Sequence, residues 1–412
     1  MADSADTTPA RSPTPVIAAR VGLGPRIGML AVAGGFVAAN GHFSQPLLPA
    51  MARDFGVPSA AMGVLPAVTQ LGLAIGLLTI LPLYDLIERR RTIVATLLLL
   101  AAAAALQSVS YSLFALWATA FFVGLGCCAA QLMTPYAALL APPGREGQAS
   151  SLVLSGVLVG VLLSRVIAGL VEQYAGWRYL YAGSSICVLL VALILAKTGL
   201  PSAPAERTSY AALMRSMGAL IATMPRLRRH AMNGALTFGA LMAFWATYAS
   251  HLLAEFGLGP LQTGLVGLVG VAGATGASMA GRWVDKGRFR QAQLAAALLM
   301  LLGYVFLWLW QGSIAMFCVG VLLIDVAGGL SHAGNQSSAF KLDPAARGRI
   351  NSVYMVSYFM GGAISVSIGT LLFAVWGWSA VCGYAGALAL LLLLFELLRP
   401  VAALPQRRRA HG

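Results

Sequence analysis

Apolar segments of about 20 residues recur along almost the whole chain, separated by short polar breaks. A helix of that length crosses the roughly 30 Å hydrocarbon core of a bilayer and pairs its backbone polar groups internally. Of the 412 residues, 59% are hydrophobic and only 10% are charged, whereas soluble domains carry roughly 25% charged residues. The sequence therefore predicts an all-α polytopic membrane protein.

The apolar runs define twelve candidate spans in two sets of six. They lie near 26–50, 60–83, 92–110, 113–140, 148–171 and 177–197, and near 231–254, 261–284, 291–310, 313–338, 349–374 and 377–399. We accordingly divide the chain into a disordered cytoplasmic tail (1–25), an N-terminal six-helix bundle (26–197), a linker (198–230), a C-terminal six-helix bundle (231–400) and a basic cytoplasmic tail (401–412). Apolar residues at helical spacing over 210–224 predict an amphipathic helix on the cytoplasmic surface.

The basic residues indicate which side of the membrane each connection faces. With the N-terminus in the cytoplasm, 24 of the 27 Lys and Arg residues fall in cytoplasmic tails and connections, and only Arg53 and Arg178 fall on the other side. This is the positive-inside bias, and it predicts that both termini are cytoplasmic. The net charge of +14 is then a topology signal, so we expect no nucleic-acid partner. We expect a monomer in the cell inner membrane.

The sequence carries no recognisable catalytic or metal-binding motif. All five cysteines lie in apolar segments without CxxC or Cys/His spacing, and neither HExxH nor GxSxG occurs. A phosphate loop is absent as well, which disfavours an ATP-driven pump. We expect no metal, no cofactor and no catalytic residue, and an integral membrane enzyme is the less favoured class.

The two sets of spans repeat at an offset of about 200 residues. Asp85 corresponds to Asp285, "GREGQASS" (144–151) corresponds to "RGRINSV" (347–353), and Gly-Trp at 176–177 recurs at 377–378. Three landmarks with a common offset indicate a duplicated six-helix unit. Many transporters are built from such internal repeats.

The connection between the second and third spans of each half resembles the hallmark of the major facilitator superfamily, in which Gly and Asp are followed by basic residues. The second half carries this motif well, and the first half carries the variant "LPLYDLIERRR". That variant, and the stretch 335–363, are similar to the bacterial sugar-, nucleoside- and drug-efflux branch. The matching residues are Gly281, Asp285, Lys286 and Arg288 in one half and Asp85, Arg89, Arg90 and Arg91 in the other.

The resemblance implies two pseudo-symmetric six-helix bundles around a cavity that opens to alternate sides. The motif residues then form a conformational latch, whose ion pairs stabilise one conformer and break in the other; a solvated topology loop is the alternative. Two departures concern proton coupling. The antiporter branch usually has Arg four residues before Gly124, where this chain has Ala120, and the fifth span lacks the usual Gly-Pro motif.

Few ionisable residues lie within the spans, and such residues usually face a cavity or a partner. Asp325 is near the middle of the tenth span, His332 follows seven residues later, and Asn335 lies a further turn on. This stripe is a candidate proton or substrate pathway, and a buried, satisfied carboxyl is the alternative. Arg165 in the fifth span is a second candidate; it either binds an anionic group or snorkels to the interface.

Further polar residues are candidate substrate contacts, because the resemblance places the first, fourth, seventh and tenth helices around the cavity. They are Asn40 and Gln45 in the first span and Gln131 in the fourth; interhelical hydrogen bonds are the alternative. Glycines at intervals of three in the eighth span, including Gly267 and Gly270, predict close helix packing, with Gly156 and Gly160 of the fifth span as the expected partners.

These features favour a secondary active transporter that exports a small organic solute or drug, coupled to protons by exchange. Export follows from the resemblance alone, and an uptake permease of the same fold is the alternative. The expected partners are a small-molecule substrate, protons and the lipid bilayer.

Overall fold

The computed structural model describes residues 24–198, 209–343 and 346–398, and these residues form helices and their connections. Of the two predicted tails, residues 1–23 and 401–412 lie outside the described residues, whereas Gly24 and Pro25 begin the first helix. The first half comprises α1 (Gly24–Asn40), α2 (Ser44–Asp54), α3 (Ser59–Met62), α4 (Val64–Leu86), α5 (Arg89–Ser108), α6 (Leu113–Cys127), α7 (Ala129–Leu140), α8 (Glu146–Tyr174) and α9 (Trp177–Lys197). The second half comprises α11 (Pro225–Phe256), α12 (Pro260–Val266), the 3₁₀ turn η1 (Gly267–Val271), α13 (Ala272–Asp285), α14 (Phe289–Leu309), α15 (Ile314–Phe340) and α16 (Arg347–Leu397).

These elements build eleven continuous helical segments that are long and apolar enough to cross a membrane. The last, α16, has 51 residues and changes direction at Gly377, where φ is 73°. Positive φ is a backbone conformation that glycine adopts without a steric penalty. The two arms of α16 are therefore two spans, and the predicted twelve-span, all-α fold is confirmed.

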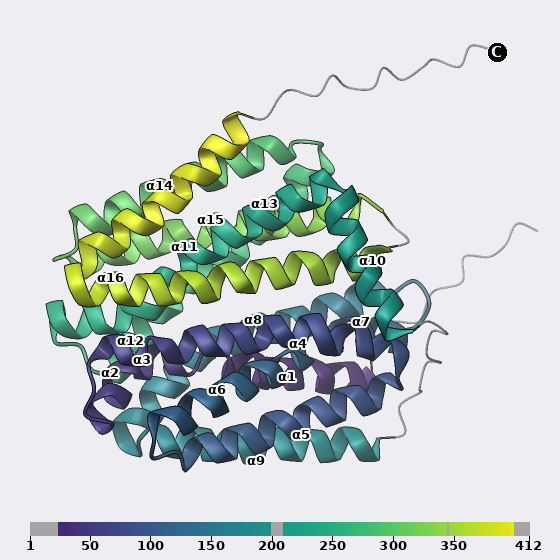
Figure 1. Ribbon diagram of the computed structural model, residues 1–412, viewed down its shortest axis with the longest axis horizontal. Helices are drawn as coiled ribbons and strands as arrows, with labels where there is room; N and C mark the ends of the chain where they lie inside the picture. Colours follow the sequence, from purple (N-terminus) through teal and green to yellow (C-terminus); the bar gives the residue numbers. More distant parts are fainter. Residues whose placement is uncertain (1–23, 199–208, 344–345, 399–412) are drawn as a thin grey trace, which may run out of the picture.

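The helices form two bundles that lie side by side, with the first half below and the second half above in Figure 1. Within the first half α1 packs on α8, α4 on α6 and α5 on α9; within the second, α11 packs on α16, α13 on α15 and α14 on both α15 and α16. We call the end where α1 begins and α16 stops the termini end, and the opposite end the far end. Helix α10 (Tyr210–Thr223) connects the halves at the termini end, on the right of Figure 1.

Helix α10 packs on protein as well as joining the halves. Its N-cap is Ser209, whose side chain accepts a hydrogen bond from the Ala212 amide at 3.2 Å. Leu213 and Met217 are buried, and the helix contacts α4 of one half and α11 and α16 of the other. The apolar face that the sequence assigned to the membrane surface thus covers the seam between the two halves.

The duplication is visible in the backbone of the two halves. Gly176 and Gly377 both have positive φ, 96° and 73°, and each precedes a tryptophan that opens the last span of its half. The hallmark connection differs, because Gly287 has a φ of 72° whereas Glu88, in the corresponding turn, has a φ of −55°. The first-half turn therefore contains no residue in the left-handed conformation, which explains why it does not need a glycine and can carry Glu88.

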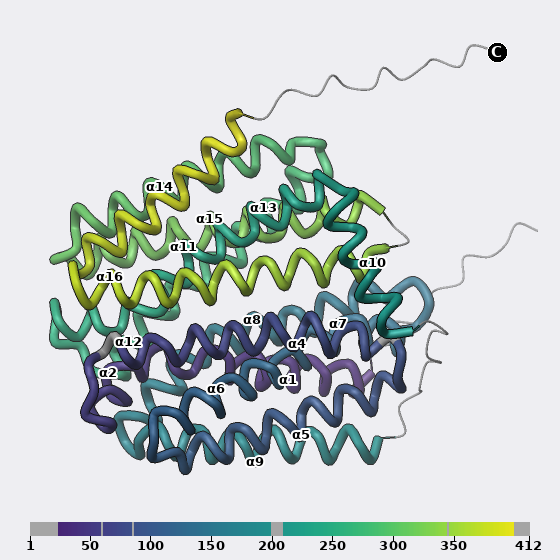
Figure 2. The backbone as a smooth tube through the Cα atoms, in the orientation of Figure 1, coloured from purple at the N-terminus to yellow at the C-terminus, as the bar shows by residue number. Residues whose placement is uncertain are grey.

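Contacts between the halves are closest at the far end. Helix α4 packs along α16, and α8 packs on α12 and η1, whereas α8 makes at most marginal contact with α13. A Cβ added at Gly63 would collide with Thr370, and one added at Gly169 would collide with the Pro260 carbonyl. The halves are thus closed at the far end and diverge between α8 and α13 toward the termini end. Figure 2 shows α4 of the first half lying beside the first arm of α16.

The predicted partners of the packing glycines are wrong. Gly156 and Gly160 of α8 pack against the backbone of α1, at Ala31 and Gly35, and not against the eighth span. Glycine permits this close approach because it has no side chain, which is how small residues bring membrane helices together. The glycines of the eighth span instead face Arg165, Trp245 and α15.

Candidate functional site

A cavity of about 450 Å³ lies between the two halves. One wall is α8 with His42 of the α1–α2 connection, and the other is formed by α11, η1, α13, α15 and α16. Its lining is mostly apolar and aromatic, including Leu241, Trp245, Phe238 and Tyr358, with Arg165 and Asp325 as the charged members. An apolar pocket with a few convergent polar groups is the usual form of a small-molecule site.

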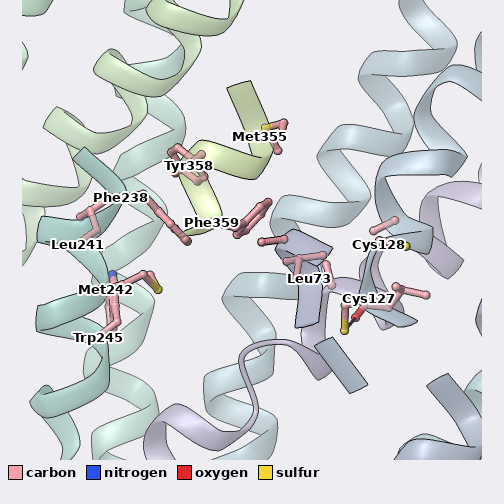
Figure 3. Close-up of a cluster of buried hydrophobic side chains, with 14 of the residues drawn as sticks. Leu73, Cys127, Cys128, Phe238, Leu241, Met242, Trp245, Met355, Tyr358 and Phe359 are labelled. Atoms are coloured by element: carbon pink, nitrogen blue, oxygen red, sulfur yellow. Dashed lines mark hydrogen bonds between the residues drawn. The ribbon is translucent and has the colours of Figure 1, made fainter. Parts of the chain in front are cut away.

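Buried side chains from both halves form a cluster that adjoins the cavity through Phe238 and Met242. Figure 3 shows Phe238, Met242 and Phe359 of the second half directed toward Leu73 of the first. Phe238 stacks on Tyr358 with ring centroids 4.0 Å apart. Gln45 and Gln70 both place Nε2 near the Met242 sulfur, at 3.9 and 3.7 Å, which are weak contacts because a thioether is a poor acceptor.

Arg165 projects from α8 of the first half onto an aromatic ring of the second half. Its guanidinium carbon lies 3.6 Å from the centroid of the Trp245 ring, and Nε donates to Gln45 Oε1 at 3.3 Å. The residue is 5% exposed, so it does not snorkel to the interface. Buried Arg normally pairs with a carboxylate, yet the described residues place no carboxylate within ion-pair distance of Arg165.

Asp325 faces the same cavity from α15. Its Oδ2 atom is buried and has no hydrogen-bond partner among the described residues. A Cβ built on Gly270 would lie 3.2 Å from Trp245 Cζ2 and 3.3 Å from Asp325 Oδ2, so the carboxyl and the indole flank the same glycine. The structure therefore brings Arg165 and Asp325 to one tryptophan, on opposite halves, without joining them in an ion pair.

The glycine row of the eighth span makes room for this arrangement. A Cβ on Gly267 would lie 2.7 Å from Arg165 Cδ, and Gly273 and Gly276 admit the backbone of α15. The row contains the 3₁₀ turn η1, a tighter helix that often marks a functional or strained position. Its glycines thus fix where Arg165 and Asp325 lie.

Gly267→Ala is expected to displace the Arg165 side chain and to lower transport about tenfold, because a misplaced binding group loses roughly 1.4 kcal/mol of interaction. Folding should be nearly unaffected, since the methyl meets a flexible side chain. The measurement is initial flux in proteoliposomes, with Gly383→Ala as the control because nothing lies within 4 Å of that position. Equal fluxes for both variants would contradict this role for the glycine.

His332 lines the cavity beside two tyrosines. Its Nδ1 lies 3.0 Å from the Tyr354 hydroxyl, and its ring lies 4.4 Å from that of Tyr358. His42 reaches the cavity from the first half, with Nδ1 3.0 Å from the Ala38 carbonyl oxygen. Both histidines line the same cavity as Asp325, and an imidazole is a group that can take up or release a proton.

The other predicted site residues lie outside the cavity lining. Asn40 donates to the Phe36 carbonyl and accepts from Ser184 at 2.8 Å, which ties α1 to α9. Gln131 is half-buried in α7. Gln45 reaches the site indirectly, through Arg165. Asn335 belongs to a separate polar network inside the second half.

That network joins four helices of the second half around a buried carboxylate. Glu396 is fully buried in α16 and pairs with Arg229 at 3.3 Å, and Asn233 Nδ2 donates to it at 2.8 Å. Asn335 connects the cluster to α14, since its Nδ2 donates to Gln293 Oε1 at 2.9 Å. Sequence reasoning missed Glu396 because it stands near the end of the last apolar run; its charge inside that run was the available signal.

Glu396→Gln is expected to destabilise the protein by about 2 kcal/mol, because the buried side chain loses charge-assisted hydrogen bonds from Arg229 and Asn233. The amide keeps the size of the side chain, so the change reports the charge. Thermal unfolding in detergent measures it, and Glu255→Gln on an exposed carboxylate is the control. A melting temperature equal to that of the control would show that the pair contributes nothing.

The predicted latch residues form contacts within their own halves. Glu88 pairs with Arg91 at 2.5 Å and with Arg90 at 3.6 Å, and Arg90 also donates to the Thr198 carbonyl at 3.0 Å. Arg89 lies over the Tyr84 ring. In the other half Lys341 lies 3.9 Å from Asp285, both largely exposed. The side chain of Asp85 lies outside the description, so its role as a latch stays a prediction.

Gly281, Lys286 and Arg288 complete the second-half motif at the end of α13. Gly281 has nothing within 4 Å of an added Cβ, and Arg288 and Lys286 flank the turn at Gly287. These residues lie at the termini end, where the halves diverge. The ion pairs between described residues do not cross from one half to the other there.

Comparison with known proteins identifies the family. The Major Facilitator Superfamily profile matches residues 30–309 and 230–411. The chain belongs to the major facilitator superfamily. It is 35% identical over 368 residues to the Uncharacterized transporter YgaY of Escherichia coli O157:H7, covering 89% of this chain and 93% of that protein. It is 27% identical over 314 residues to the Chloramphenicol resistance protein of Streptomyces lividans, covering 74% and 77%.

A solved structure shares the fold of this superfamily member. The bacterial homolog of the human lysosomal transporter Spinster, in its inward-facing and occupied conformation, superposes with a TM-score of 0.70 at 12% identity, covering 91% of this chain and 96% of that one. Membership and fold together show a multi-pass membrane transporter with a small-molecule substrate, and not an enzyme.

Proposed function

We propose that the protein is a proton-coupled secondary transporter that exports a small organic solute by alternating access, from a cell inner membrane with both termini in the cytoplasm. The observation that carries this proposal is the cavity between the halves, in which one carboxyl oxygen of Asp325 is buried without a partner. An intramembrane carboxyl in such a place is a natural proton carrier. The cavity then faces the cytoplasm, because the termini end is the open one.

Export is supported by the resemblance to the efflux branch and by the relative named as a chloramphenicol resistance protein. Exchange of substrate for protons is the mode that the resemblance favours. At the position where the antiporter branch usually has an Arg for proton coupling, this chain has the buried Ala120. Asp325 therefore takes the role of proton carrier in this proposal, with His332 and His42 in the lining of the same cavity.

The test is transport by the purified protein in liposomes. Vesicles are loaded with a panel of small organic solutes, including chloramphenicol, and a pH gradient is imposed. Flux of at least one solute that responds to the gradient, and that requires Asp325, is the expected result. Flux that ignores the gradient in every case would refute proton coupling, while leaving passive transport as the function.

A further inference from the structure

We propose that the substrate is a monovalent organic anion that binds Arg165 and crosses the membrane together with one proton carried by Asp325. This inference rests on the proposed function, and it specifies both the charge of the substrate and its fixed stoichiometry with the proton. It replaces exchange, the mode that the resemblance favours, with co-transport. The two charged side chains line one cavity from opposite halves, and a net charge is costly to bury there.

Arg165 is the anion-binding group because it is held in place without being neutralised. Trp245 stacks on one face of its guanidinium at 3.6 Å, and Gln45 accepts from Nε at 3.3 Å. Neither partner carries a negative charge. Arg165 lines the cavity, and Arg presents paired N–H groups that match a carboxylate, sulfonate or phosphate. A site that positions Arg in this way favours an anion.

The groups that face Arg165 and Asp325 do not supply a second fixed charge. Trp245 and Tyr248 face them from α11, Gly267 and Gly270 from η1, and His332 from the same helix as Asp325. The further titratable groups around the pair are His42 of the α1–α2 connection, Tyr304 of α14 and Tyr358 of α16. Tyrosines are neutral over the pH range of the test, and the two histidines stay neutral because burial disfavours the charged form of an imidazole. The balance of charge therefore rests on Arg165, Asp325 and the substrate.

Closing the cavity removes its side chains and any bound substrate from water. A closed form in which these groups carry a net charge is therefore strongly disfavoured. An empty cavity with ionised Asp325 is neutral, because Arg165 and Asp325 can pair across the two halves when these approach. A protonated Asp325 leaves Arg165 uncompensated and holds the cavity open. Protonation together with one bound anion restores neutrality, and the loaded cavity can close.

The two permitted closed forms define the transport cycle. The loaded form carries one proton on the Asp325 carboxyl and one anion on Arg165, and the empty form returns with the two side chains paired. An anion without a proton leaves a net charge of −1, and a proton without an anion leaves +1. The proton and the anion therefore move together, and an organic acid made in the cell leaves with its proton down its own gradient.

A cationic substrate fits this site poorly. Arg165 repels it, and the neutral Arg165–Asp325 pair would let the empty carrier return without a proton, which removes the coupling that exchange requires. The apolar and aromatic lining, with Phe238, Leu241 and Tyr358, adds that the anion carries an apolar or aromatic body. An aromatic sulfonate meets this description and stays ionised at all relevant pH values, so the proton must then sit on the protein.

The inference can be tested without a substrate, by measuring how fast a water-soluble thiol reagent labels a cysteine in the cavity. Ser155 lines the cavity and is exposed, so Ser155→Cys in a cysteine-free background reports opening. Thr223→Cys on exposed α10 corrects for the effect of pH on thiol chemistry. Corrected labelling in the parent protein should fall about tenfold from about pH 5.5 to about pH 8, because burial favours the protonated carboxyl of Asp325 at the lower pH and the empty cavity closes only when that carboxyl is ionised.

The variants should then differ in how their labelling depends on pH. Asp325→Asn cannot neutralise Arg165 and should label fast at both pH values, whereas Arg165→Gln should reverse the dependence, closing at low pH and opening at high pH. Arg165→Lys keeps the charge and should keep the parent sign, which shows that the fold survives. The same pH dependence in Asp325→Asn, Arg165→Gln and the parent would overturn the inference.

The charge of the substrate is tested by adding probes at about pH 5.5, where a protonated Asp325 leaves Arg165 uncompensated and holds the empty cavity open. Naphthalene-2-sulfonate at millimolar concentration should slow the labelling of Ser155→Cys, and naphthalen-2-ylmethylammonium should not. Slowing by the cation, or by neither probe, would contradict an anionic substrate. A cavity whose labelling never changes with pH, probe or variant would instead refute alternating access, and with it the proposed function.

Discussion

Asp325→Asn is expected to reduce net proton-coupled flux about 100-fold while leaving exchange of labelled for unlabelled substrate within about threefold of the parent, since loss of the coupling group blocks only the empty return step. Asparagine mimics the protonated carboxyl in size and hydrogen bonding. The loaded carrier can therefore still close and reopen. The empty carrier cannot, because Arg165 then has no negative partner.

The measurement compares the two modes in the same proteoliposomes with a solute that the parent transports. Asp325→Glu is the matched control, because it restores a titratable group one methylene longer and should recover part of the net flux. Retained exchange also shows that the variant is folded. Loss of both modes, with no recovery by Glu, would mean that Asp325 maintains the structure of the site and does not carry the proton.

Gly124→Val is expected to destabilise the protein by about 3 kcal/mol, because overpacking where two helix backbones meet cannot be relieved by moving a side chain. A Cβ at this position in α6 would collide with the Thr69 backbone of α4, and Gly72 of α4 meets the Phe121 carbonyl in return. The two helices would have to separate, which breaks the packing of the first half.

Thermal unfolding of the purified protein in detergent reports this change. Gly183→Val is the control: it is an exposed helical position of α9 with nothing within 4 Å of an added Cβ. Both variants add the same branched side chain to a helix, so the difference between them isolates the contact. Equal melting temperatures would show that α4 and α6 can move apart without loss.

The architecture was predictable because it depends on local properties of the chain. Apolar length and the repeat landmarks predicted the spans and their two-fold arrangement. Gly377 illustrates the limit, since one glycine with a φ of 73° separates two spans that the helix length alone would merge. Positive φ at Gly176 and Gly377 then explains why Gly-Trp is the most recognisable landmark of the repeat.

The candidate site was predictable only in part. Asp325 and Arg165 stand out because a charge in an apolar run is costly. That both side chains lie beside Trp245 could not be predicted, because it depends on how the two halves dock. Asn335 was grouped with Asp325 on one face, yet ten residues at 100° per residue place it about 80° away around the helix. That rotation turns Asn335 toward α14 and away from the cavity.

Reciprocal motion of the two ends tests alternating access most directly. Spin labels at Gly147 and Gly281 report the distance between the halves at the termini end, and labels at Tyr174 and Glu255 report it at the far end; all four positions are exposed. At high pH, where the empty carrier can close over its cavity, the account predicts that the first distance shortens as the second lengthens. Two distances that stay fixed across pH, or that change in the same direction, would contradict it.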